Sequence, residues 1–330
     1  MRGGSAGTGS VPVPCRGRAA RRATIAARLR PSRAPPSTDV SYPLADKLPH
    51  FVALTRLDRP IGILLLLWPT LVALWFAAGG PPPTGTLLIF VAGTVLTRSA
   101  GCAVNDFADR RIDGRVARTR HRPLATGALS AREALAATAL LMGCAFALVL
   151  LTDRATVLLS FGALALATAY PFAKRVTHFP QVVLGAAFAF GIPMAFTAVT
   201  GTTGAVTWTL FAAAVAWAVA YDTLYAMADR EDDLAIGVKS TAVILGRADL
   251  AVVAAMHALS LALLALAGAM DGRGAAWFAG LAVAAVLAAM QLRLAADRDP
   301  AHCFRAFVDN HRLGLAVFAG AALDFALGGA

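Results

Sequence analysis

Long apolar segments alternate with short polar loops along most of the chain. Nine such segments lie near residues 61–79, 86–104, 133–151, 155–170, 181–200, 205–224, 249–269, 275–292 and 306–327. A helix that crosses a bilayer needs roughly 20 apolar residues, whereas the strands of a membrane barrel are about half as long and alternate apolar with polar residues. The pattern therefore predicts an all-α, polytopic membrane protein with about nine transmembrane helices. Asp309, His311 and Arg312 leave the start of the ninth segment open.

The composition agrees with a membrane protein. Of the 330 residues, 58% are hydrophobic and 15% are charged, and a soluble domain of this length could not solvate so much apolar surface. The net charge is +11, but residues 1–50 alone hold nine Lys/Arg against two Asp. Because the rest of the chain has no basic patch interleaved with aromatic residues, we expect no nucleic-acid partner.

The first 45 residues differ in composition from the rest of the chain. They are rich in Arg, Ala, Gly and Pro, have no acidic residue before Asp39, and lack the continuous apolar stretch of a secretory signal. Two interpretations stay open: a disordered basic extension, which an upstream start codon could have added, and an organellar transit peptide. The transmembrane domain is expected over residues 46–330.

Positive charges are distributed unequally between the loops. Most Lys and Arg residues follow the second, fourth, sixth and eighth segments, while the intervening loops hold only Arg154 and Arg273. Cytoplasmic loops of membrane proteins carry the excess of positive charge. We therefore expect the even-numbered loops to face the cytoplasm from a bacterial inner membrane, with the matrix side of the mitochondrial inner membrane as the alternative.

Two of these basic loops also carry acidic residues, which the charge rule does not explain. Each acidic set falls on one face if the preceding segment stays helical: Asn105, Asp109 and Asp113 after the second segment, and Asp222, Asp229 and Asp233 in the sixth. Like charges at this spacing destabilise a bare helix, and Mg²⁺ is usually held by one or two carboxylates with substrate phosphates and water. The alternative is a pair of solvated helix ends. Because both sets lie on one side of the membrane, we favour a shared site where Mg²⁺ holds a diphosphate.

Basic and aromatic residues on the same side suit a diphosphate ligand. Arg118 and Arg122 lie four residues apart and could each grip phosphate oxygens with two donors. Tyr170 and Lys174 are also four apart, at the end of the fourth segment. Arg98 lies deeper, and it either snorkels to the interface or binds an anionic group of a second substrate.

Such a site suits the chemistry of an allylic lipid diphosphate. Metal ions neutralise the charge that develops on a departing diphosphate, and the departure leaves a carbocation. An apolar cavity excludes the water that would quench this cation. An acceptor held nearby could then attack it.

The stretches that hold these residues resemble the two signatures of the UbiA family of intramembrane prenyltransferases. RSAGCAVNDFADRRIDGRVARTRHRPLATG is similar to the first, NDxxDxxxD followed by RTxxRPL, and YDTLYAMADREDDLAIGVKST is similar to the second, DxxxD. LDRPIGILLLLWPTLVALW and YPFAKR resemble elements of its 4-hydroxybenzoate branch. The similarity covers about residues 45–327, and the N-terminal 45 residues match nothing expected of the family.

The resemblance implies nine helices around a central cavity and a Mg²⁺-dependent reaction. A polyprenyl group would pass from polyprenyl diphosphate to the ring carbon meta to the carboxylate of 4-hydroxybenzoate, a step of ubiquinone synthesis. It also implies these roles: Asn105, Asp109 and Asp113 for one Mg²⁺, Asp229 and Asp233 for the other, Arg118, Arg122 and Lys174 for the diphosphate, and Asp222, Tyr170 and Arg98 near the acceptor.

Two other functions stay open. The first is prenyl transfer to another aromatic acceptor, such as a naphthoate, homogentisate or a porphyrin. The second is an ion-coupled transporter, which would place its acidic residues near the bilayer midplane rather than at one interface.

Overall fold

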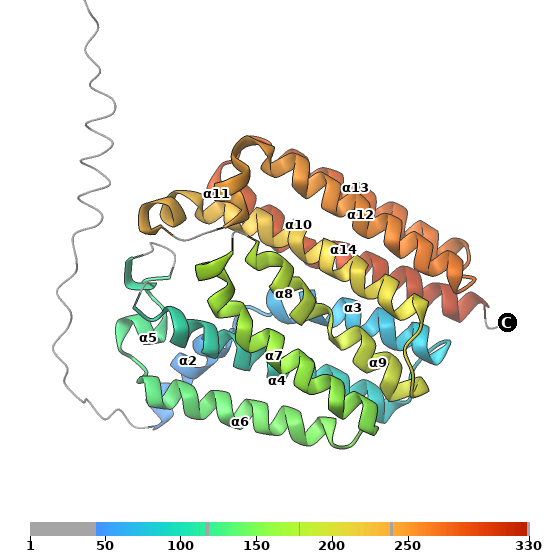
Figure 1. Ribbon diagram of the computed structural model, residues 1–330, viewed down its shortest axis with the longest axis horizontal. Helices are drawn as coiled ribbons and strands as arrows, with labels where there is room; N and C mark the ends of the chain where they lie inside the picture. The colour runs from blue at the N-terminus through green and yellow to red at the C-terminus, as the bar shows by residue number, and fades with distance from the viewer. Residues whose placement is uncertain (1–43, 112, 116–118, 178, 238–239, 329–330) are drawn as a thin grey trace, which may run out of the picture. The chain divides into compact units, whose positions relative to one another are not determined.

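The computed structural model describes residues 44–111, 113–115, 119–177, 179–237 and 240–328, and the stretch from Leu44 onward is one compact unit. Its elements, drawn in Figure 1, are α2 (Leu44–Thr55), α3 (Ile61–Ala78), α4 (Thr84–Asp109), η1 (Asp113–Arg115), α5 (Pro123–Thr126), α6 (Ala131–Val149), α7 (Arg154–Val176), α8 (Pro180–Ala189), α9 (Gly191–Thr200), α10 (Ala205–Ile236), α11 (Thr241–Leu245), η2 (Gly246–Ala248), α12 (Asp249–Met270), α13 (Ala275–Leu294) and α14 (Pro300–Gly328). Residues 1–43 of the predicted N-terminal extension lie outside the described residues, and its last two residues, Leu44 and Ala45, belong to α2.

The predicted all-α membrane architecture is confirmed. Within the described ranges, eight helical stretches are long and apolar enough to cross a membrane, and α7 contains a shorter apolar stretch, Arg154–Tyr170. Together these nine cover all nine predicted segments, and α2 precedes them. The figure of nine is approximate, because the fifth segment forms two helices. Pro193 has no N–H to donate to the carbonyl of Ala189, and the helix is interrupted at Phe190.

Two helix ends differ from the expected pattern, and both lie near the acidic residues. The helix α4 ends at Asp109, so the prediction that Asp113 continues its face is wrong: Asp113 instead begins the short 3₁₀ helix η1. By contrast, α10 runs for 32 residues, through the whole second acidic stretch. It stops at Gly237, whose φ of 74° is the left-handed conformation that commonly ends a helix.

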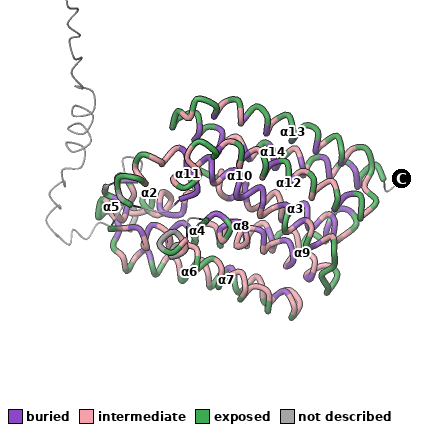
Figure 2. Tube along the Cα trace, turned by 45° about the horizontal axis from the view of Figure 1, so that its top comes forward, coloured by how far each residue is buried: buried purple, intermediate pink, exposed green. Residues whose placement is uncertain are grey.

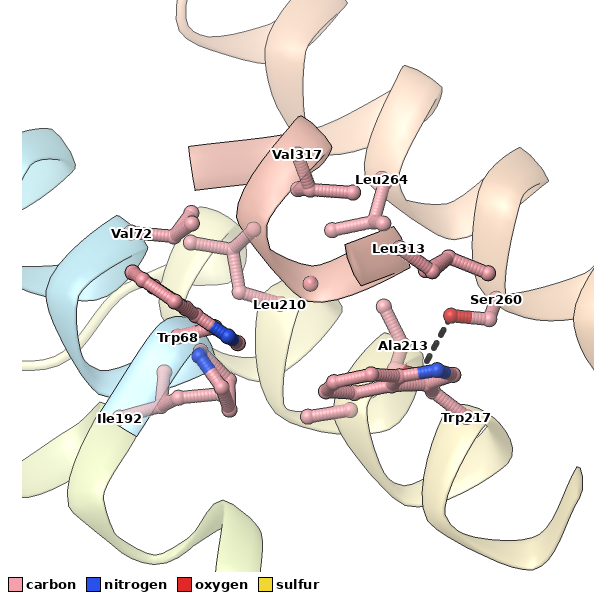
Figure 3. A pocket seen from close by; sticks show the side chains of 13 residues that line it. Trp68, Val72, Ile192, Leu210, Ala213, Trp217, Ser260, Leu264, Leu313 and Val317 are labelled. Atoms are coloured by element: carbon pink, nitrogen blue, oxygen red, sulfur yellow. Dashed lines mark hydrogen bonds between the residues drawn. The ribbon is translucent and has the colours of Figure 1, made fainter. Parts of the chain in front are cut away.

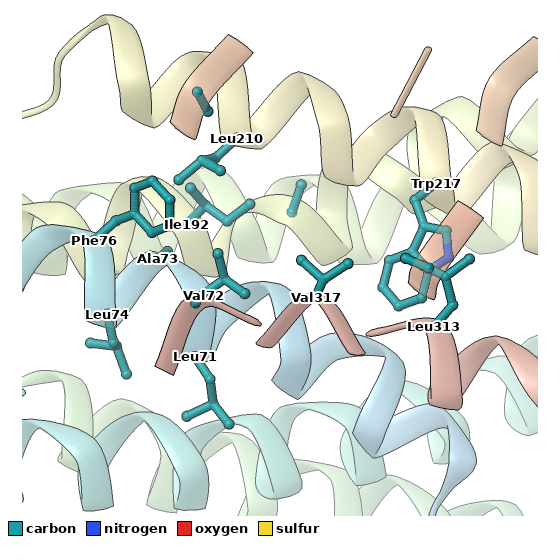
Figure 4. Close-up of a cluster of buried hydrophobic side chains, with 14 of the residues drawn as sticks. Leu71, Val72, Ala73, Leu74, Phe76, Ile192, Leu210, Trp217, Leu313 and Val317 are labelled. Atoms are coloured by element: carbon teal, nitrogen blue, oxygen red, sulfur yellow. The ribbon is translucent and has the colours of Figure 1, made fainter. Parts of the chain in front are cut away.

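The main apolar core joins α3, α9, α10 and α14. Figure 4 shows Val72, Ile192, Leu210 and Val317 packed between these helices. At one end of this core, Trp217 Nε1 donates a hydrogen bond to Asn310 Oδ1 at 2.9 Å, which links α10 to α14. The core therefore fixes α10 against α3 and α14 without using any of the acidic residues.

A small apolar cavity of about 40 Å³ lies inside this core. Figure 3 shows its lining, which includes Trp68, Leu210 and Leu313, and the hydrogen bond that Ser260 donates to the carbonyl of Ala213 at 2.8 Å. A buried water needs two to four polar partners, and this lining is almost entirely apolar. The cavity is a packing void and is separate from the acidic residues.

The outer faces of the helices expose large apolar side chains, as the tube in Figure 2 indicates for α6 and α13. Leu140, Leu151, Val286 and Leu323 are each more than half exposed. Soluble monomers rarely expose apolar surface on this scale, whereas a bilayer would cover it. The chain is therefore a polytopic membrane protein.

Candidate active site

A cavity of about 1320 Å³ opens between α3, α4, α7, α8 and α10. Most of its lining is apolar, and its polar residues include the carboxylates at the C-terminal ends of α4 and α10. Figure 1 shows that α5 and α11, which follow these two helices, lie on the same side of the described unit. The two acidic sets therefore share one cavity.

The structure brings nearly all the predicted site residues to this cavity. It is lined by Arg98, Asn105, Asp109, Asp113, Arg122, Tyr170, Asp222, Asp229 and Asp233. Arg118 lies outside the described residues, and so does the side chain of Lys174, whose backbone belongs to α7.

The first acidic wall of the cavity consists of Asn105, Asp106, Asp109 and Asp113, and arginines hold it in place. Asp106, only 1% exposed, accepts hydrogen bonds from Arg56 Nη2 at 2.9 and 3.0 Å and forms an ion pair with Arg122 Nη1 at 3.0 Å. Arg122 also donates to both carboxylate oxygens of Asp113, at 3.0 and 3.1 Å. Arg122 thus links α4 to η1, and any phosphate contact it makes must add to these ion pairs or replace them.

The loop between η1 and α5 keeps this arrangement in place. The Thr119 hydroxyl donates to the carbonyl oxygen of Asp113 at 2.9 Å. Arg122 has an extended backbone and is followed by Pro123, whose fixed φ suits the first position of a helix. The loop therefore turns back, and the Arg122 side chain reaches the end of α4.

The electrostatics of the first wall favour a cation. Burial raises the pKa of the Asp113 carboxyl from its ordinary value, because it disfavours the charged form. The nearby Arg122 lowers this pKa, while the carboxylates of Asp106 and Asp109 raise it by repulsion. Repulsion among these carboxylates would be relieved by a bound cation.

The second wall is one face of α10. Asp222, Asp229 and Asp233 all line the cavity, whereas Asp232 does not. On another side of the same turn, Arg230 forms an ion pair with the fully buried Asp249 of α12. The end of α10 is therefore anchored to α12 while its other face presents carboxylates to the cavity.

Arg98 lies deeper on α4 and lines the cavity. Its Nη1 donates to Cys102 Sγ at 2.7 Å, and its guanidinium lies 5.6 Å from the centre of the Phe188 ring on α8. A Cβ added to Gly62 would lie 2.5 Å from Arg98 Nε, so glycine at this position leaves room for the side chain. Of the two interpretations of Arg98, these contacts favour the one in which it faces the cavity.

The donor set fits a metal that arrives with its substrate. Among the residues that the structure describes, no three His, Cys, Asp or Glu side chains form a preformed metal group. Asn105, Asp109 and Asp113 on one wall and Asp229 and Asp233 on the other supply only oxygen ligands to the shared cavity. Mg²⁺ commonly needs one or two carboxylates when phosphates complete its shell. The arrangement suits Mg²⁺ bound between carboxylates and a diphosphate.

Three residues of the site were not singled out from the sequence. Asp106 follows Asn105 directly, so the acidic motif itself could have drawn attention to it. Arg56 gave no such signal, because its partner Asp106 lies 50 residues away. Gln181, which also lines the cavity, is a lone polar residue at the start of an apolar segment.

Comparisons with known proteins point to one family. The model of the UbiA prenyltransferase family matches residues 66–317. A protein of Azotobacter vinelandii named 4-hydroxybenzoate octaprenyltransferase is 57% identical over 277 residues, which cover 84% of this chain and 94% of that protein. A protein of the same name from Chromohalobacter salexigens is 57% identical over 289 residues, which cover 87% and 97%.

Solved structures share the fold. The apo structure of a UbiA homolog from Aeropyrum pernix K1 has a TM-score of 0.72 and 29% identity, over 79% of this chain and 97% of that chain. The structure of a UbiA homolog from Archaeoglobus fulgidus bound to GPP and Mg²⁺ has a TM-score of 0.62 and 17% identity, over 83% and 99%. Family model, close relatives and fold agree, and the chain belongs to the UbiA prenyltransferase family.

Proposed function

We propose that this protein transfers a polyprenyl group from a polyprenyl diphosphate to the ring carbon meta to the carboxylate of 4-hydroxybenzoate, in ubiquinone synthesis. The observation that carries the proposal is the cavity, in which carboxylates from α4, η1 and α10 share one apolar chamber. The name of the relatives at 57% identity supports 4-hydroxybenzoate as the acceptor.

In this proposal the diphosphate binds between the two acidic walls. Asn105, Asp109 and Asp113 hold one Mg²⁺ and Asp229 and Asp233 hold the other, and the bound metal neutralises the charge of the leaving diphosphate. The fold relative solved with GPP and Mg²⁺ supports this donor class. Arg122 contacts phosphate oxygens, as do Arg118 and Lys174.

The rest of the cavity receives the prenyl chain and excludes water. Side chains such as Leu66, Phe90 and Leu184 line it, so no nucleophilic water is held beside the allylic carbon. The new carbon–carbon bond forms between the ring and this carbon as the bond to the diphosphate oxygen breaks. The attacked ring carbon then loses its proton.

The acceptor lies between Arg98 and the acidic walls. Arg98 binds the carboxylate of 4-hydroxybenzoate, because Arg98 lines the cavity and a guanidinium matches a carboxylate with two donors. Asp222 and Tyr170 line the cavity between these groups, and Asp222 accepts the proton that the ring carbon loses.

The protein works in the bacterial inner membrane, with the acidic walls facing the cytoplasm. The excess of Lys and Arg in the loops after α4, α7, α10 and α13 supports this orientation. Family membership and the position of the carboxylates at helix ends leave no support for the ion-coupled transporter.

An acceptor screen tests the proposal. Membranes that contain the protein are given Mg²⁺, a polyprenyl diphosphate and one radiolabelled acceptor: 4-hydroxybenzoate, a dihydroxynaphthoate or homogentisate. We expect label in a lipid product only with 4-hydroxybenzoate, and none with membranes that lack the protein. Prenylation of another acceptor while 4-hydroxybenzoate stays unreacted would contradict the proposed acceptor.

A further inference from the structure

Gln181, the second residue of α8, is a buried polar side chain in the cavity wall. It is 2% exposed and lines the cavity, and its Oε1 has no hydrogen-bond partner among the described residues. Buried polar atoms nearly always have a partner, so this unpartnered amide oxygen, itself almost without accessible surface, calls for an explanation. A polar group of the substrate would supply the missing partner when a small rotation of the amide turns the oxygen into the cavity.

The position of Gln181 follows from the face of α8 that it shares with Phe188. Gln181, Leu184 and Phe188 all line the cavity, at the spacing of one helical face. Phe188 is the residue against which Arg98 lies. Gln181 comes seven residues before Phe188, which is about 10 Å along the helix axis.

The same seven-residue spacing separates Arg98 from Asn105 in the first acidic wall. Asn105 comes seven residues after Arg98 on α4, again about 10 Å along the axis. Because α4 and α8 are the second and fifth spans, they run in opposite directions. Gln181 therefore lies at the level of Asn105, while Arg98 and Phe188 lie deeper.

We propose that the carboxamide oxygen of Gln181 accepts a hydrogen bond from the 4-hydroxyl of the aromatic acceptor. This inference rests on the proposed function, in which Arg98 binds the carboxylate. The hydroxyl is para to the carboxylate, so an acceptor anchored at Arg98 directs it toward the acidic walls, where Gln181 lies.

This contact has two chemical consequences. It fixes the long axis of the ring, so that the carbon beside the hydroxyl lies at the depth of the allylic carbon of the donor. It also makes the site selective, because a buried group that hydrogen-bonds a substrate hydroxyl is left unpaired by an analogue without one. Gln181 would thus discriminate between aromatic acids by their para substituent.

The test compares the full-length Gln181→Leu protein with wild type and with Val182→Leu, a control at an exposed position of α8 that does not line the cavity. Steady-state kinetics are measured in detergent with each substrate varied in turn. We expect Gln181→Leu to raise the KM for 4-hydroxybenzoate about tenfold, equivalent to about 1.4 kcal/mol, with an unchanged KM for the polyprenyl diphosphate. The Val182→Leu protein should keep both constants.

Inhibition by 4-methoxybenzoate, which cannot donate this hydrogen bond, distinguishes a substrate contact of Gln181 from a purely structural role. Wild type should bind 4-hydroxybenzoate about tenfold more tightly than the methoxy analogue, and Gln181→Leu should lose this preference. An unchanged preference, or a parallel rise of both KM values with a lower melting temperature, would overturn the inference. Failure of the proposed function would instead appear in wild type, as no prenylation of 4-hydroxybenzoate.

Discussion

At the scale of single residues, Asp106 is the charge on which the first acidic wall depends. It lies on α4 and pairs with Arg56, from the turn after α2, and with Arg122, from the residue before α5. One buried carboxylate therefore joins three segments that are distant in the sequence. Through Arg122, which also pairs with Asp113, it connects the end of α4 to η1.

Replacing Asp106 by Asn should lower the melting temperature of the purified protein by several degrees. The change removes the carboxylate partner of Arg56 and leaves Arg122 paired with Asp113, and breaking a fully buried pair costs about 3–5 kcal/mol. The cost should fall at the low end of this range, because the side chains of Arg56 and Arg122 stay 26% and 16% exposed.

The control for this prediction is Asp58→Asn. Asp58 pairs with Arg59 at 3.4 Å on the surface, where an ion pair contributes at most about 1 kcal/mol. Thermal unfolding in detergent, followed by circular dichroism, compares the two variants. Equal melting temperatures would show that the buried pair does not hold the wall together.

The sequence predicted the site residues that repeat at helical spacing and missed those that depend on the fold. Asp229 and Asp233 could be assigned to one site with Asp109, because both acidic stretches lie at the ends of apolar segments on the same side of the membrane. Arg56 could not be found this way, since its contact with Asp106 arises only when α2 returns to α4. The same holds for Gln181, whose burial depends on how α8 packs.

At the scale of elements, α13 and α14 approach each other closely at Gly280 and Gly320. A Cβ at Gly280 would lie 2.8 Å from the Cα of Gly320 and 2.9 Å from the carbonyl oxygen of Ala316. Small residues let membrane helices approach this closely, and the gain in packing stabilises the pair. Hydropathy predicted both helices but carried no information on this crossing.

We therefore expect Gly280→Ala to destabilise the protein by about 1–3 kcal/mol, the usual cost of overpacking. The backbone of α14 must move, because the colliding atoms belong to its main chain. Gly85→Ala on α4 is the matched control, since no atom lies within 4 Å of the added Cβ. Equal midpoints of chemical unfolding for the two variants would contradict the close contact.

The helix boundaries show a similar limit of hydropathy. The fifth apolar segment is continuous in hydropathy, and the interruption at Phe190 follows from the missing N–H of Pro193. The short helix η1 was missed because Asp113 fits the four-residue spacing of a longer α4. Lengths of apolar stretches thus predicted the number of spans better than their ends.

At the scale of the whole molecule, the shared site requires that the loops after α4 and α10 lie on one side of the membrane. Single cysteines at Gly114 and Glu231, both exposed, should react with an impermeant thiol reagent from the same side. A cysteine at the exposed Thr202, between α9 and α10, should react only from the other side. Labelling of Gly114 and Glu231 positions from opposite sides would end the model of a shared cavity.

The central claim is that carboxylates from two walls of one cavity together support Mg²⁺-dependent prenyl transfer. The most direct test measures label transferred from 4-hydroxybenzoate to lipid by wild type, Asp109→Ala, Asp229→Ala and Asp232→Ala, with Mg²⁺ and with a chelator. Asp232 is the matched control, because it lies on the same turns of α10 but does not line the cavity. Expression and melting temperature of each variant establish that it is folded.

We expect wild type and Asp232→Ala to form product only with Mg²⁺. Asp109→Ala and Asp229→Ala should each lose about 100-fold or more of the rate, since each removes, from a different wall, a carboxylate ligand of the Mg²⁺ that would neutralise the leaving diphosphate. Unimpaired turnover in either of these two variants, or full activity in the chelator, would contradict the account.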